Sequence, residues 1–420
     1  MSIGQEIIAA CERLGRHSDD PDALTVAYLS AAHRAVADEL KQEMAAAGLT
    51  VTIDAVGNVI GRLCCGRPAA RTLLTGSHFD TVRNGGRFDG RLGIVLPIAL
   101  ARHLNESGER LPFDLEVIAF AEEEGLRYAS TFLGSSPLVG QFDASVLERT
   151  DAAGVRMRDA IKDAGLDPDG IAGLRRDPAR LLGYYEVHIE QGPVLLQAGE
   201  ALGVVTSIAG GVRHSCRVIG TAGHAGTVPM ALRHDAGTAA AEMVLAMEER
   251  CRSDPSGSVV GTAGRFEVVR GATNVIPGEA QFTIDLRASA DGPRDRALAD
   301  VLHSCQEIAR RRAVSFASEL TMKVPATPCT PAWVDALAAA VAGLGLPARR
   351  MPSGAGHDAM MMGRAMPMAM LFVRCGNGGV SHSPAETMSA EDADQAAAAT
   401  LAFWRGLGAA AQDAPDGARE

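Results

Sequence analysis

Helix-like and strand-like patterns alternate along the first half of this 420-residue chain, and that alternation restricts the fold more than any other feature. Apolar residues recur at three and four spacing in residues 23–47, which predicts a helix, whereas residues 49–59 and 72–76 have the composition of strands. A second helix is predicted at 92–104 and a further strand at 115–120. Such alternation favours a mostly parallel sheet with helices on its faces.

The rhythm changes after Gly211. Residues 214–324 predict the order strand, helix, strand, strand, helix, strand, which is the ferredoxin-like pattern of a small α+β domain. A proline-rich stretch at 325–331 then leads back to helix and strand patterns. We therefore expect one α/β domain made of residues 1–211 and 326–420, interrupted by a ferredoxin-like domain of residues 212–325.

Composition excludes several classes of protein. The chain has 40 Lys and Arg against 51 Asp and Glu, and its formal net charge of −11 argues against nucleic-acid binding. No apolar stretch approaches the ~18 residues of a membrane span, and the first residues lack the basic and apolar segments of a secretory signal. Eight cysteines without a CxxC pair indicate reduced thiols, so we expect a cytoplasmic protein.

Polar residues gather directly after the predicted strands. His78 follows residues 72–76, and ligands of open α/β sheets bind beyond the carboxyl ends of strands. Asp80 is placed to accept the other imidazole N–H and so to orient a metal-bound histidine. Asp89 follows a Gly-Gly pair, and its carboxylate can bridge two cations. A surface turn is the alternative interpretation of this segment.

Three consecutive carboxylates, Glu122–Glu124, follow the strand predicted at 115–120. Their mutual repulsion costs stability unless cations offset it. Adjacent glutamates can divide the work, because one can bind a metal while its neighbour acts as a general base. A solvated acidic turn is the simpler interpretation, but this strand, like the one before His78, delivers polar groups at its carboxyl end.

Two further histidines stand in comparable places. His188 lies near the end of a third predicted strand, and His382 lies in a glycine-rich loop after a strand predicted at 366–373. Three imidazoles and two carboxylates form a mixed set suited to Zn, Mn, Co or Ni. The candidate ligands are His78, Asp89, Glu124, His188 and His382. With Asp89 as a bridge, one ion would also bind His78 and His188, and the other Glu124 and His382.

These segments together resemble the hydantoinase/carbamoylase amidase family, within the aminoacylase/carboxypeptidase superfamily of di-metal hydrolases. The matching segments follow one another from residue 75 to residue 386 and cover most of the chain. They are GSHFDTVRNGGRFDG, AEEEG with the LGS of residues 133–135, HIEQGPV, GTAGHAGTVPM, ATNVIPG, the IDLR of residues 284–287, SGAGHDA and VSHSPAE.

The resemblance implies two divalent ions per subunit, Zn, Mn, Co or Ni, held by the five candidate ligands. It implies that Glu123 is the general base and that Asp80 is the carboxylate behind a metal-binding histidine. The larger domain would then be catalytic, and the inserted domain would be both a lid over the metals and the contact of a homodimer.

Residues of the inserted domain acquire roles only through the resemblance. His224 matches an imidazole that stabilises the oxyanion, supplied by its own or the partner subunit. Asn274 and Arg287 match residues that hold a substrate carboxylate, a task that suits the planar guanidinium. Gln191 and the backbone at Gly356 are similar to further substrate contacts. Taken alone, His224 and Asn274 would be interpreted as turn residues and Arg287 as a surface charge.

The expected activity is hydrolysis of a ureido or carbamoyl C–N bond in a small substrate that carries a carboxylate. Residues 126–135 are closer to allantoate amidohydrolases than to many carbamoylases, which favours allantoate. N-carbamoyl-L-amino acid hydrolase and β-ureidopropionase are alternatives. Arg91 stands where a small residue is more common in the family.

Three interpretations outside this activity stay open at the level of sequence. They are an aminoacylase or dipeptidase-like hydrolase that uses the same metals, a noncatalytic binding protein that has lost them, and a thiol-dependent amidase. The complete ligand set and Glu123 argue against the binding protein.

Overall fold

The computed structural model describes residues 1–413, and the chain divides into two compact units. The first unit comprises Met1–Thr206, Cys329–Met351 and Gly356–Glu420, and the second comprises Ser207–Pro328 and Pro352–Ala355. Among residues 1–413, no helix is both long enough and apolar enough to cross a membrane.

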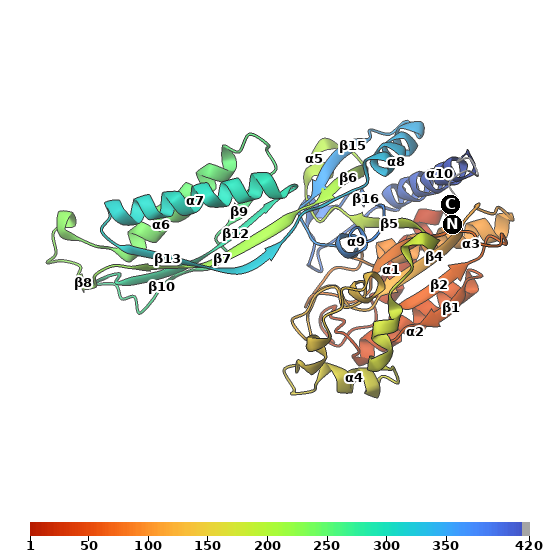
Figure 1. Cartoon of the computed structure of the whole chain (residues 1–420), viewed down its shortest axis with the longest axis horizontal. Helices are drawn as coiled ribbons and strands as arrows, with labels where there is room; N and C mark the ends of the chain where they lie inside the picture. The colour runs from red at the N-terminus through yellow and green to blue at the C-terminus, as the bar shows by residue number, and fades with distance from the viewer. Residues whose placement is uncertain (414–420) are drawn as a thin grey trace. The chain divides into compact units, whose positions relative to one another are not determined.

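A nine-stranded mixed sheet forms the centre of the first unit (Figure 1). Its neighbouring strands run in the order β1, β2, β4, β3, β5, β16, β6, β14, and β15 pairs with β6. The four central strands β4, β3, β5 and β16 are parallel, as the alternating pattern predicted. The strands are β1 (Thr50–Ile53), β2 (Val59–Leu63), β3 (Thr72–His78), β4 (Asp114–Phe120), β5 (Leu181–Ile189), β6 (Leu202–Ile208), β14 (Thr327–Pro328), β15 (Arg349–Ser353) and β16 (Met368–Val373).

Helices flank this sheet, and α3 packs on its central strands. Residues 92–101 of α3 are all apolar and buried, because the helix packs on β3, β4 and β5. A Cβ on Gly93 would lie 2.4 Å from the Val187 carbonyl oxygen, so only glycine permits this close approach. The helices of this unit are α1 (Ile3–Leu14), α2 (Ala31–Ala46), α3 (Leu92–Ser107), α4 (Met157–Asp163), α5 (Val194–Ala198), α8 (Pro331–Gly343), α9 (Asp358–Met362) and α10 (Ala390–Asp413).

Two elements near the N-terminus differ from the prediction. The helix predicted at 23–47 begins at Ala31, because Ser30 caps it by accepting a hydrogen bond from the His33 N–H, and the preceding residues form a buried loop. The single strand predicted at 49–59 is two antiparallel strands, β1 and β2. Asp54 makes the turn between them by accepting hydrogen bonds from backbone N–H groups, which apolar periodicity does not reveal.

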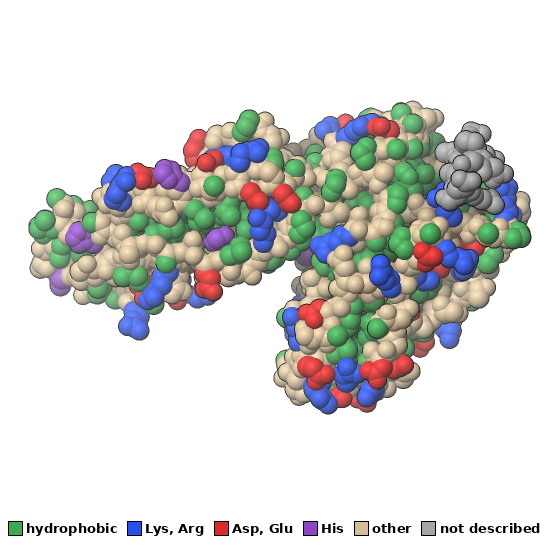
Figure 2. Space-filling model, viewed as in Figure 1, with side chains coloured by type: hydrophobic (Ala, Val, Ile, Leu, Met, Phe, Trp, Pro, Cys, Tyr) green, Lys and Arg blue, Asp and Glu red, His purple; other side chains and the backbone are tan. Residues whose placement is uncertain are grey.

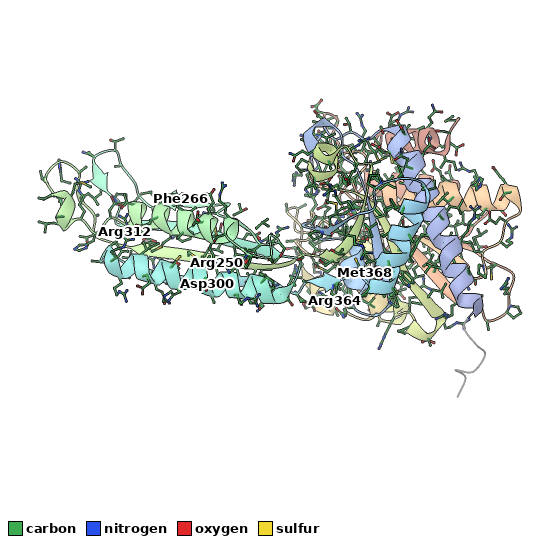
Figure 3. The ribbon with its side chains drawn as sticks, turned by 90° about the horizontal axis from the view of Figure 1, so that it is seen from above. Arg250, Phe266, Asp300, Arg312, Arg364 and Met368 are labelled. Atoms are coloured by element: carbon green, nitrogen blue, oxygen red, sulfur yellow. The ribbon has the colours of Figure 1, made fainter. Side chains whose placement is uncertain are left out.

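The second unit contains a five-stranded antiparallel sheet with the order β10, β12, β7, β13, and β9 pairs with β12. Alternate residues of β12 are buried, and helices α6 and α7 contact β12 and β7. Arg250 of α6 and Asp300 of α7 form an ion pair at 2.7 Å (Figure 3). The elements are β7 (Gly210–Ile219), β8 (Gly223–His224), α6 (Ala236–Arg252), β9 (Val260–Thr262), β10 (Phe266–Val268), β11 (Val275–Ile276), β12 (Glu279–Ala288), α7 (Asp291–Arg311) and β13 (Ser315–Val324).

Charged side chains of both signs are interspersed on the visible face of each unit (Figure 2). In the second unit the exposed Arg213 pairs with Asp285, and the exposed Arg217 pairs with Glu279, and both acids are partly buried. The positive charges of these two arginines are thus offset by neighbouring acids.

Candidate metal centre

The site lies at the carboxyl edge of the parallel strands of the first unit. His78 is the last residue of β3 and pairs with Phe120, the last residue of β4. His188 lies one residue before the end of β5, which is parallel to β3. Because parallel strands end at the same edge of a sheet, the polar residues at and beyond their ends converge there.

Asp80 holds His78 and the acidic segment in one arrangement. Its Oδ1 lies 3.3 Å from Nδ1 of His78, and its two carboxylate oxygens accept the backbone N–H groups of Glu123 at 3.0 Å and Glu124 at 3.1 Å. With Nδ1 engaged by Asp80, the Nε2 atom of His78 faces Asp89.

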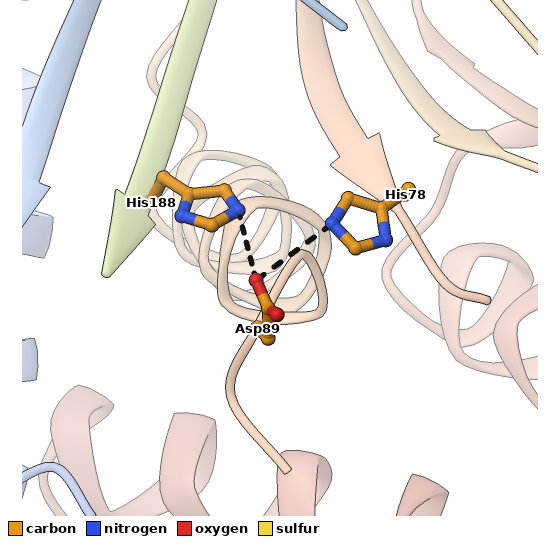
Figure 4. Close-up of side chains that lie close together, drawn as sticks. All are labelled: His78, Asp89 and His188. Atoms are coloured by element: carbon orange, nitrogen blue, oxygen red, sulfur yellow. Dashed lines mark ion pairs between the residues drawn. The ribbon is translucent and has the colours of Figure 1, made fainter. Parts of the chain in front are cut away.

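Asp89 lies between the two buried histidines (Figure 4). Its Oδ1 is 3.8 Å from Nε2 of His78 and 3.3 Å from Nε2 of His188. His188 donates its Nδ1–H to the carbonyl oxygen of Ile189 at 2.8 Å, so Nε2 carries the lone pair, and it accepts the N–H of Gly90 at 3.3 Å. Burial lowers the pKa of His188 to about 4, so the ring is neutral at pH 7, as a metal-binding imidazole must be.

The second oxygen of Asp89 faces His382. Nε2 of His382 lies 3.1 Å from Oδ2 of Asp89 and 3.3 Å from Oε1 of Glu124. Hydrogen bonds to Asp89 and Glu124 raise the pKa of His382 to about 10. Burial is the largest single effect on Asp89 and opposes its ionisation, but the hydrogen bond from His382 and the charges of the three neighbouring imidazoles together hold the pKa of Asp89 below its ordinary value.

The five candidate ligands therefore meet in two groups that share one carboxylate. In each group, one potential ligand atom from every residue lies within 4.8 Å of the others. One group is His78, Asp89 and His188, and the other is Asp89, Glu124 and His382. The imidazoles of His78 and His188, whose Nδ1 atoms are already engaged, together with His382 and the carboxylates, fit a divalent metal of the Zn, Mn, Co or Ni type.

Glu123 lies beside the two groups of candidate ligands and is almost fully buried. It groups with His78 and Glu124, whereas Glu122 enters none of the potential metal-binding groups found among residues 1–413. Burial, reinforced by the charge of Glu124, raises the pKa of Glu123 well above its ordinary value against the opposing effect of His78. Gly356 is near its carboxylate, since a Cβ there would lie 3.8 Å from Oε1 of Glu123.

Gln191 touches both groups. Its Nε2 donates to Oδ1 of Asp89 at 3.0 Å and lies 3.2 Å from Nε2 of His382. The backbone φ of Gln191 is +56°, a left-handed value that turns the chain immediately after β5.

Several buried polar residues near the site were not assigned a function from the sequence. Glu186 is fully buried and accepts hydrogen bonds from Ser77, Tyr184 and the N–H of Ala359. Arg91 is also fully buried, and burial lowers the pKa of its guanidinium to about 10. The sequence could have indicated Glu186, because it lies two residues before His188 on the same strand and residues two apart share a face of the sheet.

The three predicted substrate-binding residues of the second unit do not lie together. His224 of β8 pairs with Val275 of β11, and the N–H of Ala225 donates to the carbonyl oxygen of Asn274, so His224 and Asn274 lie together. Arg287 lies elsewhere, opposite Gly211 at the other end of β7, where it lines a cavity of about 370 Å³.

Comparisons with known proteins agree on the family. A profile of peptidase family M20/M25/M40 matches residues 74–405. The chain is 38% identical to "Allantoate deiminase 1" of Glycine max, over 96% of this chain and 90% of that protein. It is also 38% identical to an "N-carbamoyl-L-amino acid amidohydrolase" of Geobacillus stearothermophilus, over 93% and 95% of the two chains.

A solved structure gives the same result. The crystal structure of a hydantoinase/carbamoylase family amidase from Burkholderia ambifaria superposes with a TM-score of 0.88 at 32% identity, covering 96% of this chain and 97% of that one. The chain belongs to peptidase family M20/M25/M40 and, within it, to the hydantoinase/carbamoylase family of amidases.

Proposed function

We propose that this protein is a metal-dependent amidohydrolase that cleaves a ureido C–N bond of allantoate, yielding ureidoglycine or ureidoglycolate with ammonia and CO2. The observation that carries the proposal is the position of Asp89 between two groups of potential ligands, with Glu123 beside them. Allantoate is favoured because relatives from Glycine max with 38% identity are named allantoate deiminases.

The proposed ligands of two divalent ions are the residues of these two groups. His78 and His188 would hold one ion, Glu124 and His382 the other, and Asp89 both. When bound, the ions supply Lewis acidity for the substrate carbonyl and for the attacking water. Asp80 keeps Nδ1 of His78 occupied, so that Nε2 is the atom presented to the metal.

Glu123 is the proposed general base. Its carboxylate takes a proton from the attacking water and returns it to the departing nitrogen. Burial suits this task, because a raised pKa makes a carboxylate a stronger base in the ionised form.

His224 is the proposed donor to the oxyanion. The N–H of Gly226 donates to Nδ1 of His224 at 3.0 Å, so a neutral His224 carries its own proton on Nε2. That Nε2–H is free to stabilise the negative charge that develops on the carbonyl oxygen.

A homodimer is proposed because one copy cannot bring all substrate contacts together. Arg287 lies near one end of the β7–β12 ladder, and His224 and Asn274 lie beyond the other end. Eight residue pairs, or about 27 Å of strand, separate Arg287 from that other end. We propose that Arg287 holds the substrate carboxylate in one subunit while the partner supplies His224 and Asn274. Exposed apolar residues beside His224, namely Met230, Leu232 and Val275, are suited to such a contact.

An N-carbamoyl-L-amino acid is the second candidate substrate, favoured by the 38% identity to the Geobacillus stearothermophilus enzyme. The test is ammonia release by Mn²⁺-loaded protein from allantoate, N-carbamoyl-L-amino acids and N-carbamoyl-β-alanine. We expect the highest kcat/KM for allantoate. A higher value for an N-carbamoyl-L-amino acid would favour the second candidate, and no release from any of the three would refute both.

The eight free cysteines support a cytoplasmic location.

A further inference from the structure

Glu386 connects the two loops that carry Asp89 and His382. Its Oε1 accepts the backbone N–H of Phe88 at 2.8 Å and that of Asp89 at 3.2 Å. Its Oε2 accepts the hydroxyl of Ser381, the residue immediately before His382, at 2.8 Å. One carboxylate therefore bonds both segments, although they lie almost 300 residues apart in the chain.

The carboxylate of Glu386 is buried, and the backbone of the Asp89 loop packs closely against it. Glu386 is only 4% exposed, and a Cβ on Gly86 would lie 2.1 Å from its carboxyl group. Glycine at position 86 therefore lets the loop backbone close over the carboxylate. Glu386 belongs to none of the potential metal-binding groups found in the described part of the chain, so its oxygens serve the loops and not an ion.

We propose that Glu386 is a positioning residue that fixes the spacing between Asp89 and His382, and thereby the site of the ion that these two residues share with Glu124. This inference rests on the proposed metal-dependent function. The His382 loop needs such an anchor, because His382 has a φ of +54° and half of its side chain is exposed. Without the anchor, the two ligands are held at the correct separation for a smaller fraction of the time.

The test compares Glu386→Gln with wild type by titrating the metal-free protein with Mn²⁺ alone in competition with a chromogenic chelator. The amide keeps the size of the side chain but removes its charge and replaces the acceptor of the Ser381 hydroxyl with an N–H donor, so the bonds to the two loops are weakened. We expect the dissociation constant of one ion to rise about 10–100-fold while the other ion is held as in wild type. At saturating Mn²⁺ the kcat should return to near the wild-type value, which a general loss of folding would not allow.

Asp114→Asn is the matched control, because Asp114 is a buried carboxylate that bonds the Cys65 N–H and Arg62 at the opposite end of β4. We expect it to lower the melting temperature without changing Mn²⁺ affinity.

His382→Ala separates the two proposals. If His382→Ala loses one ion and Glu386→Gln binds both as wild type does, the positioning role is refuted. If both variants bind Mn²⁺ as wild type does, the metal site itself is refuted. Should Glu386→Gln not fold, Ser381→Ala removes only the His382-loop contact, and an unchanged dissociation constant there would also refute the role.

Discussion

Arg287 pairs with Gly211 at one end of the antiparallel ladder between β7 and β12, whereas His224 of β8 lies beyond the other end, about 27 Å of strand away. Both were predicted to contact one small substrate. Within one copy of the chain this separation is too long for a small substrate to contact both residues, which is why we propose that the partner subunit supplies His224.

Mixed dimers should therefore complement each other. Glu123→Gln and His224→Ala are each expected to be inactive alone. Coexpressed in equal amounts, they should recover about a quarter of wild-type activity, because half of the random dimers hold one intact site out of two. Ammonia release by the purified mixture measures this. No recovery, in a mixture shown to contain hybrid dimers, would mean that His224 acts in its own subunit.

Replacing Glu123 should remove the base and leave the metals in place. Glu123→Gln is expected to lower kcat by about 10²–10⁴-fold with unchanged metal content. Glu122→Gln is the matched control, because Glu122 is the buried neighbour that joins no potential metal-binding group of residues 1–413. It should keep most of the wild-type kcat. A near-normal rate for Glu123→Gln would exclude Glu123 as the base.

The metal content should depend on His382. We expect His382→Ala to retain about one ion per chain where wild type retains two, because its loss leaves only Asp89 and Glu124 as ligands in the second group. Elemental analysis after dialysis measures the ratio. Exposed His303 provides the control, and His303→Ala should keep both ions. An unchanged ratio in His382→Ala would refute its role as a ligand.

Acid should destabilise the first unit partly through His33. This ring is buried against Tyr28 and Phe79 and bonds the Ala121 carbonyl oxygen, and burial lowers its pKa from 6.5 to about 4. Between those two pH values only the unfolded chain takes up the proton, so stability falls as pH falls, by up to about 3 kcal/mol.

Denaturant unfolding of wild type and His33→Gln at pH 7 and pH 4 measures this effect. Glutamine can still donate to the carbonyl oxygen but does not titrate, so the loss between the two pH values should be smaller in the variant. Equal losses in the two proteins would show that His33 does not contribute.

Thiol reagents should leave the enzyme active. Burial raises the pKa of Cys11, Cys216, Cys305, Cys329 and Cys375 to about 12, whereas Cys64 is exposed. Iodoacetamide should label Cys64 first, without loss of ammonia release, and a chelator should abolish that release until Mn²⁺ is returned. Inactivation by alkylation together with indifference to the chelator would instead indicate a thiol-dependent amidase.

The convergence of the site residues could be predicted from local sequence patterns. His78 and His188 lie at or near the ends of buried strands, and the Glu122–Glu124 segment comes directly after another. Parallel strands bring the residues at their carboxyl ends to one edge of the sheet. Local patterns are sufficient for this inference because short apolar runs mark the strand ends, and the alternation of helices with strands predicts that the strands are parallel. In residues 214–324 the six predicted elements correspond to β7, α6, β10, β12, α7 and β13, whereas the short strands β8, β9 and β11 were not predicted.

Contacts between segments distant in sequence became visible only in the folded chain. The bond from Glu386 to the Asp89 loop, the amide of Gln191 on Asp89 and His382, and the separation of His224 from Arg287 all depend on strand register and loop geometry. The late start of α2 depends likewise on Ser30 and on a loop whose apolar residues are buried by other segments. Such contacts join residues tens to hundreds of positions apart, and no spacing within one segment encodes them.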